Sequence, residues 1–156
     1  MAAERLFREA LALNRMALGE GHPHVATSLS WLSWVLVAKG DHAAAEPLYR
    51  EALDIWNKKP PPRHIDVANA QAGLSIALLA LGRKEESLGP LTASFESSLQ
   101  DPNTPATSKL DRCQTLVELY EKWHTHKPDG GYDAMAAEWR AKLAQWQAST
   151  RPAETP

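Results

Sequence analysis

The chain has 156 residues, 44% of them hydrophobic, and its 17 Lys and Arg residues nearly balance its 19 Asp and Glu residues, for a net charge of −2. This composition suits one compact domain or a short repeat array, and the lack of a basic excess argues against nucleic-acid and anionic-membrane partners. One cysteine, Cys113, excludes an internal disulfide, and neither a signal peptide nor a span of ~20 apolar residues is evident, so we expect a soluble, cytoplasmic chain.

The spacing of apolar residues at intervals of three and four predicts helices throughout the chain and no strands. Segments rich in Pro and Gly separate the helices, and Gly40 and Gly82 stand where a left-handed residue would end a helix inside a hairpin. The expected helices span residues 2–18, 23–39, 42–58, 65–81, 83–99, 105–124 and 132–148. We expect one array over 1–148, with a lone helix at 2–18, hairpins at 23–58, 65–99 and 105–148, and a disordered tail at 149–156.

An internal repeat organises the first hundred residues. The phrase AERLFREAL at 3–11 returns as AEPLYREAL at 45–53, and His22, Val25 and Ala26 return 42 positions later as HxxVA at 64–68. A period of this size indicates stacked supersecondary units, each too small to bury its apolar face alone.

The stretch HPHVATSLSWLSWVLVAKGDHAAAEPLYREALDIW, at 22–56, resembles the long tetratricopeptide repeat of kinesin light chains and of many bacterial proteins. The resemblance covers about residues 3–146 and implies an all-α fold, a right-handed solenoid of antiparallel helix hairpins that acts as a protein-interaction scaffold. Residues 2–18 match only the second helix of a hairpin, so we expect the chain to be either the C-terminal part of a longer array or a truncated one. Where such repeats carry peptide-contacting asparagines, this sequence has Ser30 and Trp31, then Ala72 and Gly73.

The same resemblance implies that the first helix of each hairpin lines a concave groove for a peptide or partner segment. The positions that it assigns to the groove are Thr27, Ser30, Trp34, Val37, Asn69, Ala72, Ile76, Leu79, Asp111, Gln114, Glu118 and Glu121. An apolar surface centred on Trp34 and carboxylates in the last hairpin favour a partner with an apolar anchor and basic residues. In the alternative interpretation, Trp34 packs against a neighbouring helix and the glutamates form a solvated face.

No assembled catalytic motif is present, so we expect no enzymatic activity, no cofactor and no metal. His22 and His64 occupy equivalent positions before a helix, which favours a role in stabilising the joint. The cluster His124, His126, Asp129 and Asp133 favours a polar loop over a metal site, and Cys113 is expected to be a small buried hydrophobe.

Two alternatives to a free-standing scaffold stay open. In the first, the chain is a regulatory segment joined to a catalytic domain such as a serine/threonine kinase. In the second, it is a module that self-associates through the exposed edge of its first helix. Three tryptophans of the last hairpin either cap the array or form an exposed docking ridge; they are Trp123, Trp139 and Trp146.

Overall fold

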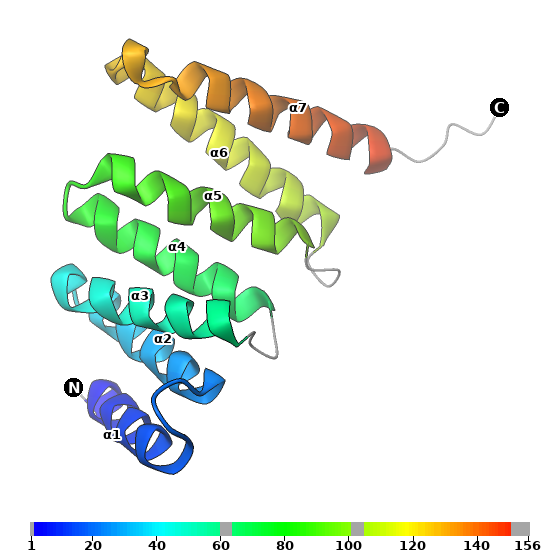
Figure 1. Cartoon of the computed structure of the whole chain (residues 1–156). Helices are drawn as coiled ribbons and strands as arrows, with labels where there is room; N and C mark the ends of the chain where they lie inside the picture. Colours follow the sequence, from blue (N-terminus) through cyan, green and yellow to red (C-terminus); the bar gives the residue numbers. More distant parts are fainter. Residues whose placement is uncertain (1, 60–63, 101–104, 151–156) are drawn as a thin grey trace. The chain divides into compact units, whose positions relative to one another are not determined.

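The computed structural model describes residues 2–59, 64–100 and 105–150. These residues form helices joined by turns, without strands, so the expected all-α class is confirmed. In chain order (Figure 1) the elements are α1 (Ala2–Leu18), α2 (Pro23–Ala38), α3 (His42–Lys58), α4 (His64–Ala80), α5 (Lys84–Gln100), α6 (Ala106–His126), the 3-10 turn η1 (Pro128–Gly130) and α7 (Tyr132–Thr150).

The helices begin and end within two residues of the expected positions. The largest differences are at the ends of α6 and α7, and α7 continues to Thr150, inside the segment expected to be a tail. The remainder of that segment, 151–156, lies outside the described residues.

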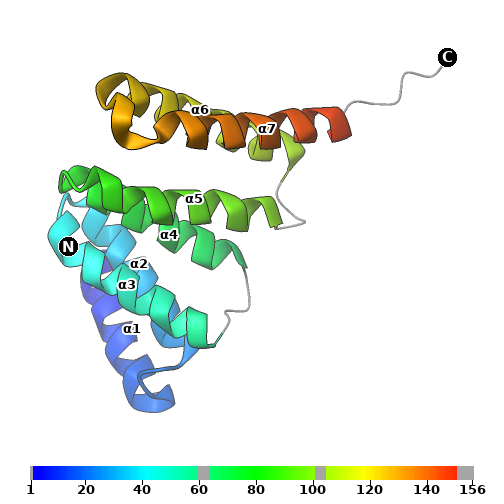
Figure 2. The ribbon, with the colours of Figure 1, turned by 45° about the horizontal axis from the view of Figure 1, so that its top comes forward.

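The chain divides into two compact units, Met1–Gln100 and Asp101–Pro156. In the first unit each helix packs against the next, and α2 with α3 and α4 with α5 form two antiparallel hairpins (Figures 1 and 2). The second unit is the hairpin of α6 and α7, closed by η1.

The turn inside each hairpin of the first unit follows directly from its glycine. Gly40 and Gly82 have φ values of +82° and +78°, a left-handed conformation that residues with a Cβ rarely adopt. After Gly40, the backbone N–H of Asp41 donates to the carbonyl of Leu36 at 2.9 Å. The Asp41 carboxylate then accepts the backbone N–H of Ala44 and so begins α3.

Each unit has its own core. In the first unit, small residues are buried beside leucines, so that neighbouring helices approach closely. Its most buried members include Ala26, Leu29, Leu32, Ser33, Leu36, Ala45, Tyr49, Ala52, Leu74, Ser75 and Leu78. The core of the second unit comes from one face each of α6 and α7 and includes Cys113, Leu116, Tyr120, Ala136 and Trp139.

Candidate functional site

A pocket of about 440 Å³ opens on the face of the first unit where α2 and α4 lie next to each other. Side chains of α2 and α4 form most of its lining, and Tyr49 and Trp56 of α3 complete it. Its lining consists of Thr27, Ser30, Trp31, Trp34, Tyr49, Trp56, Asp66, Asn69, Ala72, Gly73 and Ile76. A mostly apolar hollow with a few polar groups is the usual form of a binding site.

Large apolar side chains at the rim of this pocket are open to solvent. Trp34 is 59% exposed, Ile76 52% and Trp31 47%. The rings of Trp31 and Trp34 meet edge to face at 6.3 Å, while Phe7 of α1 stacks on Trp31 at 6.2 Å and supports it. The ring of Trp34 contacts the ring of Trp31 in its own helix and is otherwise largely open to solvent, so it is available to a partner.

The depth of the pocket depends on Gly73. A Cβ atom added to Gly73 would meet the ring of Tyr49 at Oη, Cζ and Cε2, at 2.9 Å or less. Tyr49 therefore occupies the space that a side chain at position 73 would need, and burial raises the pKa of its hydroxyl to about 12. The phenol thus remains neutral at physiological pH.

Trp56 contributes an unsatisfied donor to the same region. Its side chain is 3% exposed and lines the pocket, and its buried Nε1 has no hydrogen-bond partner among the described residues. Buried polar groups are nearly always paired in native proteins, so this indole N–H is an exception within the described part of the core.

Six of the eight groove positions assigned to the first two hairpins line this pocket. They are Thr27, Ser30, Trp34, Asn69, Ala72 and Ile76. The other two, Val37 and Leu79, lie further along the same helices and are half-buried, with Val37 packed against the core.

The four groove positions assigned to α6 belong to the second unit. Glu121 accepts hydrogen bonds from the guanidinium of Arg140 of α7, and Gln114 donates to Glu118 at 3.2 Å. The side chain of Asp111 lies outside the described residues. The carboxylate of Glu121 therefore serves an ion pair within its own hairpin.

The sequence reasoning did not assign five lining residues to the groove: Trp31, Tyr49, Trp56, Asp66 and Gly73. Two of them had a signal, because Trp31 and Gly73 occupy the same position of successive repeats, 42 residues apart, next to the assigned Ser30 and Ala72. Tyr49 and Trp56 belong to the second helix of their hairpin, and only the packed structure brings them to the pocket.

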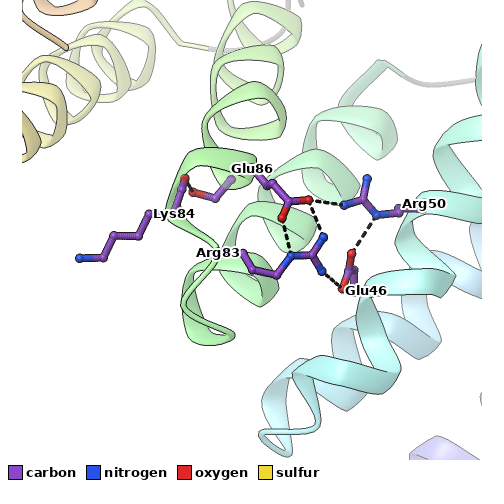
Figure 3. Close-up of polar contacts among 6 residues, drawn as sticks. Glu46, Arg50, Arg83, Lys84 and Glu86 are labelled. Carbon is purple, nitrogen blue, oxygen red and sulfur yellow. Dashed lines mark hydrogen bonds and ion pairs between the residues drawn. The ribbon is translucent and has the colours of Figure 1, made fainter. Parts of the chain in front are cut away.

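An ion network joins α3, the turn between α4 and α5, and α5. Arg83, in the turn between α4 and α5, donates to Glu46 of α3 at 2.6 Å and to Glu86 of α5 (Figure 3). The guanidinium of Arg83 lowers the pKa of the Glu86 carboxyl. In the preceding repeat Glu4, the equivalent of Glu46, accepts from Lys39 at 2.5 Å and from Arg8, and these cations lower its pKa.

His22 and Cys113 take structural positions. His22 is the N-cap of α2 and accepts the backbone N–H of His24 on Nδ1 at 3.2 Å, while the side chains of His64 and His126 lie outside the described residues. Cys113 is 1% exposed, and burial raises the pKa of its thiol. Within the described ranges, no three His, Cys, Asp or Glu side chains gather closely enough to hold a metal ion.

The last-hairpin tryptophans contact their own unit. Trp139 is buried, Trp123 lies against Tyr120 and Tyr132, and the ammonium of Lys109 sits 5.0 Å from the ring of Trp146. No helix within residues 2–59, 64–100 and 105–150 combines the length and apolar character needed to cross a bilayer.

Comparison with known proteins agrees with the packing just described. None of the curated proteins compared with the chain matches it. The family model for the tetratricopeptide repeat matches it twice, over residues 1–58 and 35–99, which together include all of α1 to α4 and nearly all of α5. Tetratricopeptide repeats generally mediate protein–protein interaction through such stacked helices. The chain belongs to the tetratricopeptide repeat family.

Proposed function

We propose that the first unit binds an extended segment of a partner protein in the pocket between α2 and α4. The observation that carries the proposal is the pocket itself, where exposed aromatic and aliphatic side chains surround a hollow of about 440 Å³. Exposed tryptophans grouped at a concave surface are typical of the residues that contribute most to binding. The chain then acts as a scaffold and not as an enzyme.

The lining favours a partner segment that combines an apolar or aromatic anchor with a neighbouring basic residue. The anchor would insert between Trp31, Trp34 and Ile76, which line the pocket and are exposed at its rim. Of the described lining residues, Asp66 is the one that carries a charge. Asp66 already interacts within the chain, and its negative charge also favours a Lys or Arg beside the anchor.

Rigid walls support this function. The stack of Phe7 on Trp31 restricts one side chain of the rim, and the ion pairs of Arg83 join α3 to the turn after α4, so part of the conformational entropy is already lost before a partner docks. The residues of the pocket are thus prepared for contact before binding.

The test is a fluorescence-anisotropy titration of the full chain with a peptide array that places one aromatic residue beside basic, neutral or acidic neighbours. Trp34→Ala should weaken the best peptide by more than about tenfold, the loss expected for a central aromatic anchor. Ala72→Leu should weaken the same peptide by filling the pocket, and Asp66→Asn should reduce the preference for basic neighbours. The matched control is Leu81→Ala, which removes an exposed leucine outside the pocket. Equal binding by all variants, or no binding to any peptide, would refute the proposal.

The 42-residue period and the conserved spacing inside it support a second, finer assignment, to the long kinesin-light-chain-like and bacterial type of this repeat. A free, buried Cys113 as the single cysteine supports a reducing compartment such as the cytoplasm. Fluorescence microscopy of the tagged full-length protein in its native cell tests the compartment.

A further inference from the structure

The two helices that line the pocket carry side chains of very different size at equivalent positions of the repeat. Helix α2 contributes Trp31 and Trp34, and 42 residues later α4 contributes Gly73 and Ile76. The lining is thus aromatic on α2 and has no side chain at position 73 on α4. Contacts between aromatic rings are worth more than the apolar area that they bury. This lining therefore favours a flat, aromatic anchor over an aliphatic one of similar size.

A tyrosine hydroxyl without a hydrogen bond lies at the inner end of the same pocket. Tyr49 of α3 lines the pocket although only 1% of the residue is exposed. Its Oη lies against Gly73, since a Cβ atom added to that glycine would be 2.3 Å from it. Burial is the cause of the raised pKa of this hydroxyl, and no hydrogen bond joins it to any residue that the structure describes.

The Tyr49 hydroxyl also differs from the polar atoms that are fully enclosed in the core. Among the described side chains, the unbonded polar atoms that packing seals from solvent include Nε1 of Trp56 and Oγ of Ser75, but not Oη of Tyr49. The oxygen of Tyr49 is therefore open to the pocket that its side chain lines. A neutral phenol can donate one hydrogen bond and accept others, so a ligand atom of either kind can pair with it.

We propose that the anchor is a tyrosine of the partner segment, with its ring beside Trp31 and Trp34 and its hydroxyl hydrogen-bonded to that of Tyr49. The inference rests on the proposed function of the pocket and names the side chain that the pocket selects. Tyr49 is then the residue that determines this specificity.

The chemistry of the alternatives explains the choice. Tyrosine joins a flat ring to a tip that both donates and accepts, whereas the ring N–H of tryptophan only donates. Phenylalanine has the ring without the polar tip, and leucine has neither. A bound phenylalanine would enclose the Tyr49 hydroxyl without a partner, and leaving a buried polar group unpaired is costly. For this reason, sites that bond to a hydroxyl discriminate well against the analogue that lacks it.

The first test compares four peptides in fluorescence-anisotropy titrations of the full chain. The peptides share the best-binding sequence of the array and differ only at the anchor, which is Tyr, Phe, Trp or Leu. The Tyr peptide should bind more than about tenfold more tightly than the Phe peptide. With Tyr49→Phe, the Tyr and Phe peptides should bind within about twofold of each other. The matched control is Tyr120→Phe, which makes the same change in an equally buried tyrosine of α6, outside the pocket, and should keep the preference.

The second test needs no peptide. Because the hydroxyl of Tyr49 makes no bond in the free chain, Tyr49→Phe should not lower the midpoint of urea unfolding followed by circular dichroism. A lower midpoint would show that the hydroxyl already has a partner, and would overturn the inference.

The binding results separate this inference from the proposed function. Equal binding of the Tyr and Phe peptides, with Trp34→Ala still weakening both, would overturn the inference and leave the pocket as the binding site. A preference for Tyr that survives Tyr49→Phe would also overturn it, because another group would then recognise the anchor's hydroxyl. Failure of all four peptides to bind would refute the proposed function itself.

Discussion

Replacing Gly73 with alanine tests the closest contact in the pocket. In a helix interior, Gly→Ala normally stabilises a protein by about 0.5–1 kcal/mol. At position 73 the new methyl group would overlap the ring of Tyr49, which is 1% exposed, so the buried ring would have to shift. Overpacking of a buried site costs about 1–3 kcal/mol. We therefore expect Gly73→Ala to lower the free energy of unfolding by about 1–2 kcal/mol.

The matched control is Gly89→Ala in α5, where an added Cβ meets nothing within 4 Å. This variant should gain about 0.5–1 kcal/mol, so that the two alanine substitutions move stability in opposite directions. Urea unfolding followed by circular dichroism at 222 nm measures both. In a Tyr49→Leu background, which removes the end of the ring, the cost of Gly73→Ala should largely disappear. If Gly73→Ala stabilises the chain as much as Gly89→Ala does, the ring of Tyr49 does not lie over Gly73 and the reasoning fails.

Two further predictions concern ionisation and reactivity. Arg83 lowers the pKa of the Glu86 carboxyl in the folded chain, so this carboxylate stabilises the fold at any pH above its ordinary pKa of 4.5, and the contribution is lost as the pH falls through the lowered pKa of the folded chain. Glu86→Gln should therefore flatten the acid side of a plot of unfolding free energy against pH. An unchanged plot would contradict the ion network. The Cys113 thiol is buried and its pKa is raised, so the folded chain should protect it from a chromogenic disulfide reagent. The thiol should react more than about tenfold faster in urea than in buffer. Equally fast labelling of the folded chain would show that the thiol is accessible.

Local signals along the chain were enough to predict each α-helix that the structure describes, but not the 3-10 turn η1. Apolar spacing places a stripe on each helix, and Gly40 and Gly82 end helices because few other residues adopt their positive φ values. The 42-residue period likewise predicted that α1 and α3 are equivalent, since seven of the nine residues at 3–11 recur at 45–53. These features depend on neighbours within a few residues, or on simple repetition, and both can be read directly.

Contacts between distant residues were decided only by the tertiary structure. Tyr49 reaches the pocket from the second helix of its hairpin because Gly73, 24 positions later, leaves it room. Glu121 was expected in a groove for a partner, and it pairs with Arg140 of its own unit. The division after Gln100 was not expected either. A repeat specifies which helices stack. The side chain that fills the space between two helices depends on how two surfaces far apart in sequence fit together, and a local sequence pattern does not contain that information.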